Sequence, residues 1–227
     1  DIGEPVEMAA EYYRQGVDEL VFYDIIASAR GRGPILDLIS RVASQVFIPF
    51  CVGGGIGTVE DIRSTILAGA EKVSLNSQAV KNPSLITEGA RIFGNQCIVL
   101  GMDAAKDDEM PSGYRVYING GRVKTDLDAL AWAKKAVDLG AGEIVLNSMD
   151  ADGTKNGYEI NLTRMIAENV SVPVIASGGG GNPQHLADVL KEGKADAALI
   201  ATMVHSGQYT VNSIKQDLQK QGVPVRL

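Results

Sequence analysis

The chain has 227 residues, which is enough for one large hydrophobic core, and α/β barrels commonly occupy roughly 200–250 residues as one domain. Apolar residues make up 45% and charged residues 22% of the sequence, ordinary values for a globular protein that argue against a disordered or a membrane class. The net charge of −7 comes without any lysine and arginine cluster, so neither nucleic acid nor an anionic membrane is expected as a partner.

The sequence also predicts a cytoplasmic protein without a metal. No run of about 18 apolar residues and no signal-peptide pattern is present. Cys51 and Cys97 each lie in an apolar run and are expected to be small buried residues rather than a disulfide or a metal pair. His185 and His205 have no cysteine or carboxylate at ligand spacing, so no metal site is predicted.

Helical and strand patterns alternate along the chain, which opens on a helix. Short apolar runs that end at glycines or polar residues predict strands, and apolar residues spaced three or four apart predict helices. The predicted strands are residues 19–26, 48–52, 72–75, 97–102, 143–148, the run that begins at 172, and 197–201. The predicted helices are 6–15, 35–46, 58–67, 83–93, 127–139, 161–169, 183–190 and 211–220. Residues 104–125 interrupt the alternation and predict an excursion loop or a small hairpin.

An internal repeat favours one of two architectures. Strict alternation with right-handed crossovers permits either an open doubly wound sheet or a closed eight-stranded barrel. Residues 16–21 match 140–145, and residues 48–55 match 172–179, at one offset of 124 residues. Two related halves of four units each make an eight-stranded barrel.

The predicted fold is therefore an α/β (β/α)8 TIM barrel built from two half-barrel repeats. One domain is expected over residues 1–227, with half-barrels at about 1–94 and 95–227. Seven strands are predicted, so the first strand of the barrel is absent from this chain, ahead of its leading helix.

The stretch VPVIASGGGG, residues 172–181, predicts a buried strand that ends in a backbone phosphate cradle. Glycines after a strand let main-chain N–H groups approach an anion, and the dipole of a following helix adds to the attraction. The repeat places Gly53, Gly54 and Gly55 at the matching point of the first half. Two cradles suit an elongated substrate with a phosphate at each end; the alternative is that both are packing turns kept by duplication.

Further candidates lie at the two ends of the predicted strands. The working face of a parallel barrel is at the carboxyl ends, where the sequence places Asp24, residues 53–55, Asn76, Ser77, Asp103, Asn147, Ser148, residues 177–181, Ala201 and Thr202. Asp103 directly follows an apolar strand, as a general acid or base requires, although a helix cap or a loop salt bridge is an alternative. Three predicted strands begin with a charged residue: Glu19, Lys72 and Glu143. These residues could form a charged ring around the barrel axis, or they could be ordinary solvated residues of the rim.

Motifs spread over the whole chain resemble the cyclase subunit of imidazole glycerol phosphate synthase, a family of histidine biosynthesis: DELVFYDIIAS, VGGGI, EKVSLNS, GMDA, SMDADGTKNGY, IASGGGG and VPVRL. The resemblance implies a (β/α)8 lyase that forms a heterodimer with a glutaminase subunit and needs no cofactor. It would join ammonia from that partner to a bis-phosphorylated ribulosyl formimino aminoimidazole carboxamide ribonucleotide. The expected products are imidazole glycerol phosphate and aminoimidazole carboxamide ribotide.

The resemblance also assigns residues by position. Asp103 matches one of two acid/base aspartates. One phosphate site matches Gly55, Asn76 and Ser77, and the other matches Asp152, Gly153, Gly179, Ala201 and Thr202. Glu19, Lys72 and Glu143 match three of the four members of a charged ammonia gate.

The sequence departs from the family pattern at its start. The first strand, with the partner aspartate, the fourth gate residue and a mobile loop, is absent ahead of Asp1. We expect residues before Asp1 in the complete enzyme, because an open barrel would expose the edges of its strands.

Two other functions remain open from the sequence. A phosphoribosyl isomerase of the same pathway uses a similar doubled barrel with two phosphate sites, but it has no need of an ammonia gate. The second alternative function is that of a non-catalytic barrel, which binds phosphorylated ligands or the glutaminase. It remains open because the first strand is missing.

Overall fold

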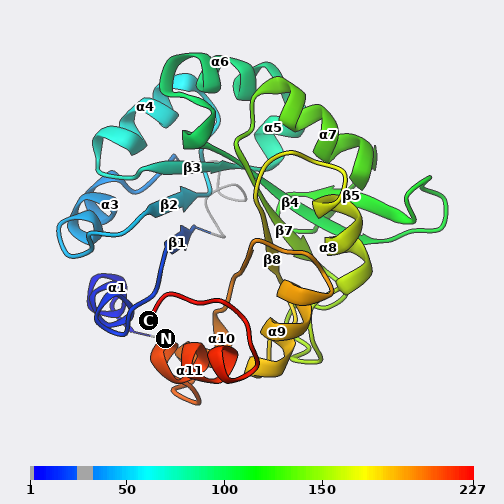
Figure 1. Cartoon of the computed structure of the whole chain (residues 1–227). Helices are drawn as coiled ribbons and strands as arrows, with labels where there is room; N and C mark the ends of the chain where they lie inside the picture. The colour runs from blue at the N-terminus through cyan, green and yellow to red at the C-terminus, as the bar shows by residue number, and fades with distance from the viewer. Residues whose placement is uncertain (1–2, 25–32) are drawn as a thin grey trace.

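The computed structural model describes residues 3–24 and 33–227, and in them a parallel sheet curls so that the helices cover its outer surface (Figure 1). Neighbouring strands follow the order β1-β2-β3-β4-β7-β8-β9, and every pair along this path is parallel. The strands on this path are β1 (Leu20–Tyr23), β2 (Phe50–Gly53), β3 (Lys72–Leu75), β4 (Ile98–Lys106), β7 (Glu143–Ser148), β8 (Val174–Ser177) and β9 (Ala197–Ala198). The predicted α/β TIM-barrel-like class is confirmed.

Helices follow the strands as the alternation predicts. They are α1 (Pro5–Arg14), α3 (Leu36–Ala43), α4 (Val59–Leu67), α5 (Ser77–Lys81), α6 (Ser84–Phe93), α7 (Ala129–Leu139), α8 (Ile160–Ala167), α9 (Pro183–Lys191), α10 (Thr202–His205) and α11 (Val211–Lys220), with a 3₁₀ turn, η1, at Asn95–Cys97. In the described part of the chain, none of these helices has the length and apolar character needed to cross a membrane.

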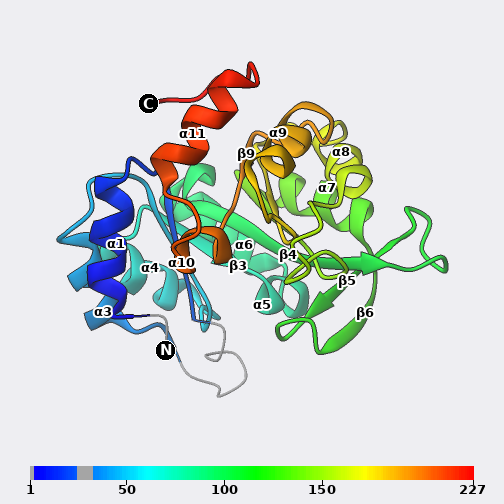
Figure 2. The ribbon, with the colours of Figure 1, turned by 90° about the horizontal axis from the view of Figure 1, so that it is seen from below.

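The excursion after β4 is an antiparallel hairpin. Strand β4 continues four residues beyond the predicted end at Met102, because its last part pairs with β5 (Tyr114–Ile118). Strand β6 (Val123–Asp128) then pairs with β5, and the hairpin extends away from the body of the molecule (Figure 2).

Three predictions differ from the structure in detail. Strand β9 spans only Ala197–Ala198, although the predicted strand ran to residue 201. Helices α5 and α10 were not predicted, because five and four residues are too few to establish a helical period. Cys51 is buried as expected, but Cys97 is only half-buried, and both are free thiols. The last residues of the predicted strand 19–26 lie outside the described part.

The core has an outer and an inner layer because successive side chains of a strand face opposite sides of the sheet. In β4, Ile98, Leu100 and Met102 pack beneath the helices in the largest apolar cluster. Val99, between them in the sequence, instead belongs to a small cluster inside the curled sheet. That inner cluster consists of Cys51, Val99, Val145 and Ile175, with Val21 and Leu199 packed against it.

The two ends of the sheet path, β1 and β9, are bridged by helices rather than by strand pairing in the described residues. The Lys215 ammonium of α11 donates to the Gly16 carbonyl at 2.7 Å and to the Asp18 carboxylate at 2.8 Å. The amide of Val211 donates to Gln15 Oε1 at 3.0 Å. The carboxyl-terminal helix is thereby tied to the segment between α1 and β1.

The outer core should dominate stability. Ile62 of α4 has no exposed surface and lies against Gly89 of α6, whereas Leu67, in the same helix, is 80% exposed. We predict that Ile62→Ala lowers the free energy of unfolding by about 2–5 kcal/mol, through lost burial and a residual cavity. The matched Leu67→Ala should change it by less than about 0.5 kcal/mol. Urea unfolding measures both, and equal losses would contradict this account of the core.

Candidate active site

Three charged side chains meet at the amino-terminal ends of the strands. The Lys72 ammonium, at the start of β3, donates to Glu19 Oε2 at 2.8 Å and to Glu143 Oε2 at 2.6 Å. The exposed fractions of these side chains are 18% for Lys72, 26% for Glu19 and 11% for Glu143. They form one largely buried network, which we call the charged layer, so the alternative of separate solvated rim residues is wrong.

Burial and pairing compete in the charged layer. Burial raises the pKa of Glu19, and the hydrogen bond from Lys72 offsets this only in part. Burial alone would lower the pKa of Lys72, but its hydrogen bonds to Glu143 and Glu19 outweigh that effect, so the pKa of Lys72 is raised. Within the described residues, the second carboxylate oxygens of Glu19 and Glu143 are buried and accept no hydrogen bond. These oxygens can accept from a further N–H donor.

Asp103 lies at the opposite end of the same interior. Its neighbours in β4, Met102 and Ala104, are buried in the outer core, so the pleat turns Asp103 toward the inside of the sheet. Asn76 Nδ2 donates to Asp103 Oδ2 at 2.9 Å, and Asn147 Nδ2 donates to Oδ1 at 3.0 Å. The carboxyl group is thus oriented by one amide on each oxygen, and each oxygen keeps acceptor capacity for another group.

The second glycine turn, which follows β8, is locked against the loop 150–158. Gly178 and Gly179 have φ values of +89° and +100°, a region that residues with a side chain rarely adopt. A Cβ on Gly179 would lie 2.0 Å from the carbonyl oxygen of Gly157. The Gly157 amide donates to the Gly179 carbonyl at 2.8 Å, and Tyr158 Oη donates to the Leu199 carbonyl at 2.9 Å. Only glycine permits this close approach.

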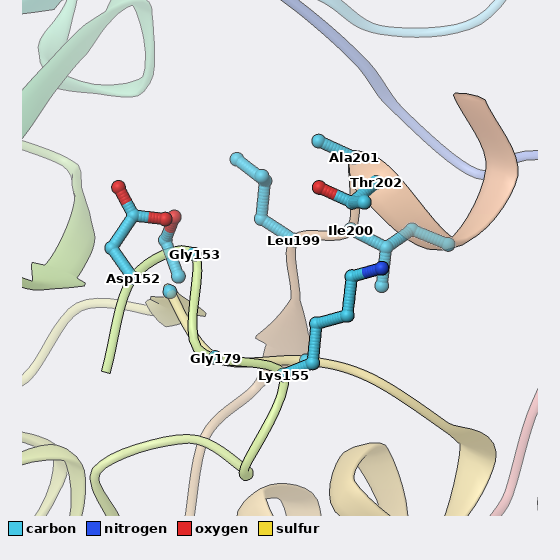
Figure 3. Close-up of a pocket in the computed structure, with 11 residues that line it drawn as sticks. Asp152, Gly153, Lys155, Gly179, Leu199, Ile200, Ala201 and Thr202 are labelled. Atoms are coloured by element: carbon cyan, nitrogen blue, oxygen red, sulfur yellow. The ribbon is translucent and has the colours of Figure 1, made fainter. Parts of the chain in front are cut away.

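This contact encloses a hollow of about 80 Å³, which suits a small polar group (Figure 3). The residues that line it come from the loop 150–158, the glycine turn and the segment after β9: Asp152, Gly153, Lys155, Ser177, Gly178, Gly179, Gly180, Leu199, Ile200, Ala201 and Thr202. They include all five residues assigned to the second phosphate site. In the described part of the chain, the N–H groups of Gly153, Gly179, Ala201 and Thr202 have no acceptor, so they are available to an anion.

The first glycine turn occupies the matching position after β2. Gly54 and Gly55 have φ values of +98° and +75°, and a Cβ on Gly54 would lie 2.3 Å from the Asp24 carbonyl oxygen. Asn76 and Ser77 follow β3, the strand next to β2. The hydroxyl of Ser77 accepts from the Asn119 amide of the hairpin at 2.8 Å, so its O–H remains able to donate.

The sequence predicted no role for Lys155. It placed Asn147 at the carboxyl end of a strand but predicted no contact for its side chain. Lys155 is the one cationic side chain among the residues that line the hollow, and Figure 3 shows it extending toward Ile200. Its place within the loop DGTKNGY was the only available signal. The role of Asn147 depends on the register that pairs it with Asp103 across β4 and β7. His185 lies beside the second glycine turn, where its Nδ1 accepts from the Gly181 amide at 3.2 Å.

The contribution of the charged layer to stability should depend on Lys72, its one cation. We predict that Lys72→Met lowers the free energy of unfolding by roughly 1–3 kcal/mol at pH 7, because it leaves two largely buried carboxylates without their cation. The raised folded pKa of Lys72 implies a stabilisation that is complete below its unfolded pKa of about 10.4 and is lost as the pH rises through the folded pKa.

Urea unfolding of both proteins between pH 7 and pH 11.5 tests this, and the difference should shrink at the alkaline end. Lys220→Met is the matched control, because Lys220 pairs with Asp217 while 74% exposed. A Lys72→Met loss no larger than the control would refute the expected contribution.

Comparisons with known proteins place this arrangement in a family. The model of the histidine biosynthesis protein family matches residues 1–210. The chain is 64% identical over 229 residues to imidazole glycerol phosphate synthase subunit HisF of Desulfatibacillum aliphaticivorans, covering 100% of this chain and 88% of that protein. It is 63% identical over 229 residues to the subunit HisF of Desulforapulum autotrophicum, with the same coverage. The HisF of Desulfosudis oleivorans is 60% identical over 230 residues, covering 100% of this chain and 89% of its own length.

The curled parallel sheet, the strand–helix alternation and the relatives that match along the full chain agree with one another. The chain therefore belongs to the histidine biosynthesis protein family, among the cyclase subunits of imidazole glycerol phosphate synthase, which are enzymes of histidine biosynthesis.

Proposed function

We propose that this chain joins ammonia, delivered by a glutaminase partner, to a bis-phosphorylated ribulosyl formimino aminoimidazole carboxamide ribonucleotide. The products are imidazole glycerol phosphate and aminoimidazole carboxamide ribotide, and the reaction takes place in the cytoplasm. The observation that carries the proposal is the position of Asp103. Asn76 and Asn147 hold its carboxyl group at the carboxyl-terminal end of the sheet, where both glycine turns also lie.

Asp103 acts as a general acid or base. The addition of ammonia to the substrate and the cleavage that follows both require protons to move at nitrogen, and an oriented carboxylate at the reacting centre can accept and return them. The Asn76 and Asn147 amides use one acceptor position on each oxygen, so the remaining positions are available to the substrate.

The two glycine turns hold the two phosphates. Gly153, Gly179, Ala201 and Thr202 present free main-chain N–H groups around the hollow. The Asp152 amide donates to the Ser148 carbonyl at 2.9 Å, at the start of the loop that carries Gly153. Gly55, Asn76 and Ser77 form the corresponding site of the first half. Strands β2 and β8, which precede the two turns, are separated by the repeat offset at both of their ends. This agreement supports one barrel of two halves, with one phosphate site in each.

The charged layer admits ammonia from the end of the sheet opposite Asp103. Glu19, Lys72 and Glu143 close the interior there, and the two carboxylate oxygens that lack a donor can accept an N–H of an arriving ammonia molecule. An isomerase would have no use for such an entrance, which favours the cyclase over the phosphoribosyl isomerase. The names of the relatives call them synthase subunits, which supports a complex with a partner subunit.

Removal of the acid/base group tests the reaction. We predict that Asp103→Asn lowers cyclisation with free ammonium by about 10²–10⁴-fold, the usual contribution of general acid–base catalysis. Asp108→Asn, at an exposed position just beyond β4, should keep the parent rate. The assay follows imidazole glycerol phosphate and the remaining substrate, with and without ammonium. If Asp103→Asn cyclises at the parent rate, Asp103 has no acid/base role. Consumption of the substrate without ammonium, with no imidazole glycerol phosphate formed, favours the isomerase.

Substitution in the second glycine turn tests phosphate binding. Gly179→Ala must place its Cβ against the Gly157 carbonyl and adopt a φ of +100°, so the loop has to move away from the hollow. We predict a KM for the substrate at least about tenfold higher, equivalent to about 1.4 kcal/mol.

Gly207→Ala is the control for this substitution, because φ there is +70° but no atom lies within 4 Å of the added Cβ. Both variants carry the backbone strain, and only Gly179→Ala disturbs the site. Equal KM values in the two variants would contradict the assignment of the turn to a phosphate.

A further inference from the structure

Tyr23, the last residue of β1, extends its ring across Gly53 of β2. A Cβ on Gly53 would lie 2.4 Å from Cε1 and 2.6 Å from Cδ1 of this ring, so only glycine leaves room for it. Tyr23 Oη and Ser74 Oγ are 3.3 Å apart, within hydrogen-bonding distance. Ser74 is 5% exposed and in turn approaches Gly101, where a Cβ would lie 2.8 Å from its Oγ. Two glycines, on the strands β2 and β4 that flank β3, therefore accommodate this hydroxyl pair.

The Tyr23–Ser74 pair lies between two functional levels of the interior, the charged layer at one end and Asp103 at the other. Tyr23 is two residues beyond Val21 of the inner apolar cluster, and Ser74 is two residues beyond Lys72 of the charged layer. Asn76, two residues beyond Ser74 and just past the end of β3, contacts Asp103. Burial raises the pKa of Tyr23, and the carboxylates of Asp103 and Glu143, one from each level, raise it further. Tyr23 as a whole residue is nevertheless 38% exposed, so it is not sealed within a packed core.

We propose that Tyr23 and Ser74 form an inner constriction through which ammonia passes from the charged layer to Asp103, an inference that rests on the function proposed for this chain. Each hydroxyl can donate one hydrogen bond and accept another, and ammonia can do both. Their own contact is long, so ammonia can insert between the hydroxyls without breaking a strong hydrogen bond.

The constriction differs in chemistry from the charged layer. The inner apolar cluster offers ammonia no hydrogen bond between the two levels. The neutral phenol supplies one without offering a negative charge that would retain ammonium, and its ring narrows the path for water. Tyr23 is thus a transfer residue that limits the escape of ammonia, and it takes no part in the proton transfers at Asp103.

The test measures imidazole glycerol phosphate formed per glutamine hydrolysed in the complex with the glutaminase subunit, together with turnover on added ammonium chloride. We expect Tyr23→Phe and Ser74→Ala each to lower the product-per-glutamine ratio by about fivefold, the size expected for one lost hydrogen bond. Tyr23→Ala, which also removes the ring, should lower the ratio further. Turnover with saturating ammonium should stay within about twofold of the parent, which also shows that each variant is folded.

The control is Tyr209→Phe, which removes a hydroxyl in the outer cluster formed with α9 and α11. Product-per-glutamine ratios in Tyr23→Phe and Ser74→Ala equal to that of the parent would overturn the constriction. Tyr23→Phe keeps every apolar contact of the ring. Its product-per-glutamine ratio therefore tests the constriction even if Tyr23→Ala does not fold. A parent that forms no product with ammonium would instead overturn the proposed function, and the inference with it.

Discussion

Residues that alternate along the parallel strands of a curled sheet must face either the covering helices or the interior, and the functional groups of this chain depend on that constraint. Strand β3 and the residue that follows it show this most directly. Lys72, Ser74 and Asn76 face inward at successive levels, while Val73 and Leu75 between them are buried in the outer core. One short segment, residues 72–76, thereby contributes to the charged layer, to the hydroxyl pair and to the orientation of Asp103. A shift of the register by one residue would bury all three polar side chains beneath helices.

Each charged side chain named in the interior has at least one partner, because unpaired buried charge is costly. Lys72 satisfies two carboxylates at one end, and two amides hold Asp103 at the other. Between these levels the apolar side chains keep the charges apart. Such a separation suits a chain that would admit a small neutral molecule at one end and perform proton transfer at the other.

The glycine turns add a constraint of a different kind. At Gly179 and Gly54 a carbonyl oxygen of another segment occupies the space that a Cβ would need. Close backbone contact joins the loop 150–158 to the second turn, and that contact shapes the hollow and leaves N–H groups around it without acceptors. The loop DGTKNGY and the glycines are therefore one structural unit, although about twenty residues separate them in the sequence.

The sequence by itself determined the strand–helix alternation, the offset between the two glycine turns and the strand ends where Asp103 and Lys72 lie, because local periodicity and glycine punctuation are properties of short segments. The family resemblance added roles for those positions, and the division into half-barrels and the site roles stay predictions. Only the tertiary structure decided that Glu19, Lys72 and Glu143 form one buried network, that Asn147 orients Asp103, and that Tyr23 reaches Ser74 across Gly53. Those contacts join different strands, and their partners follow from sheet register and curl, which no local pattern specifies.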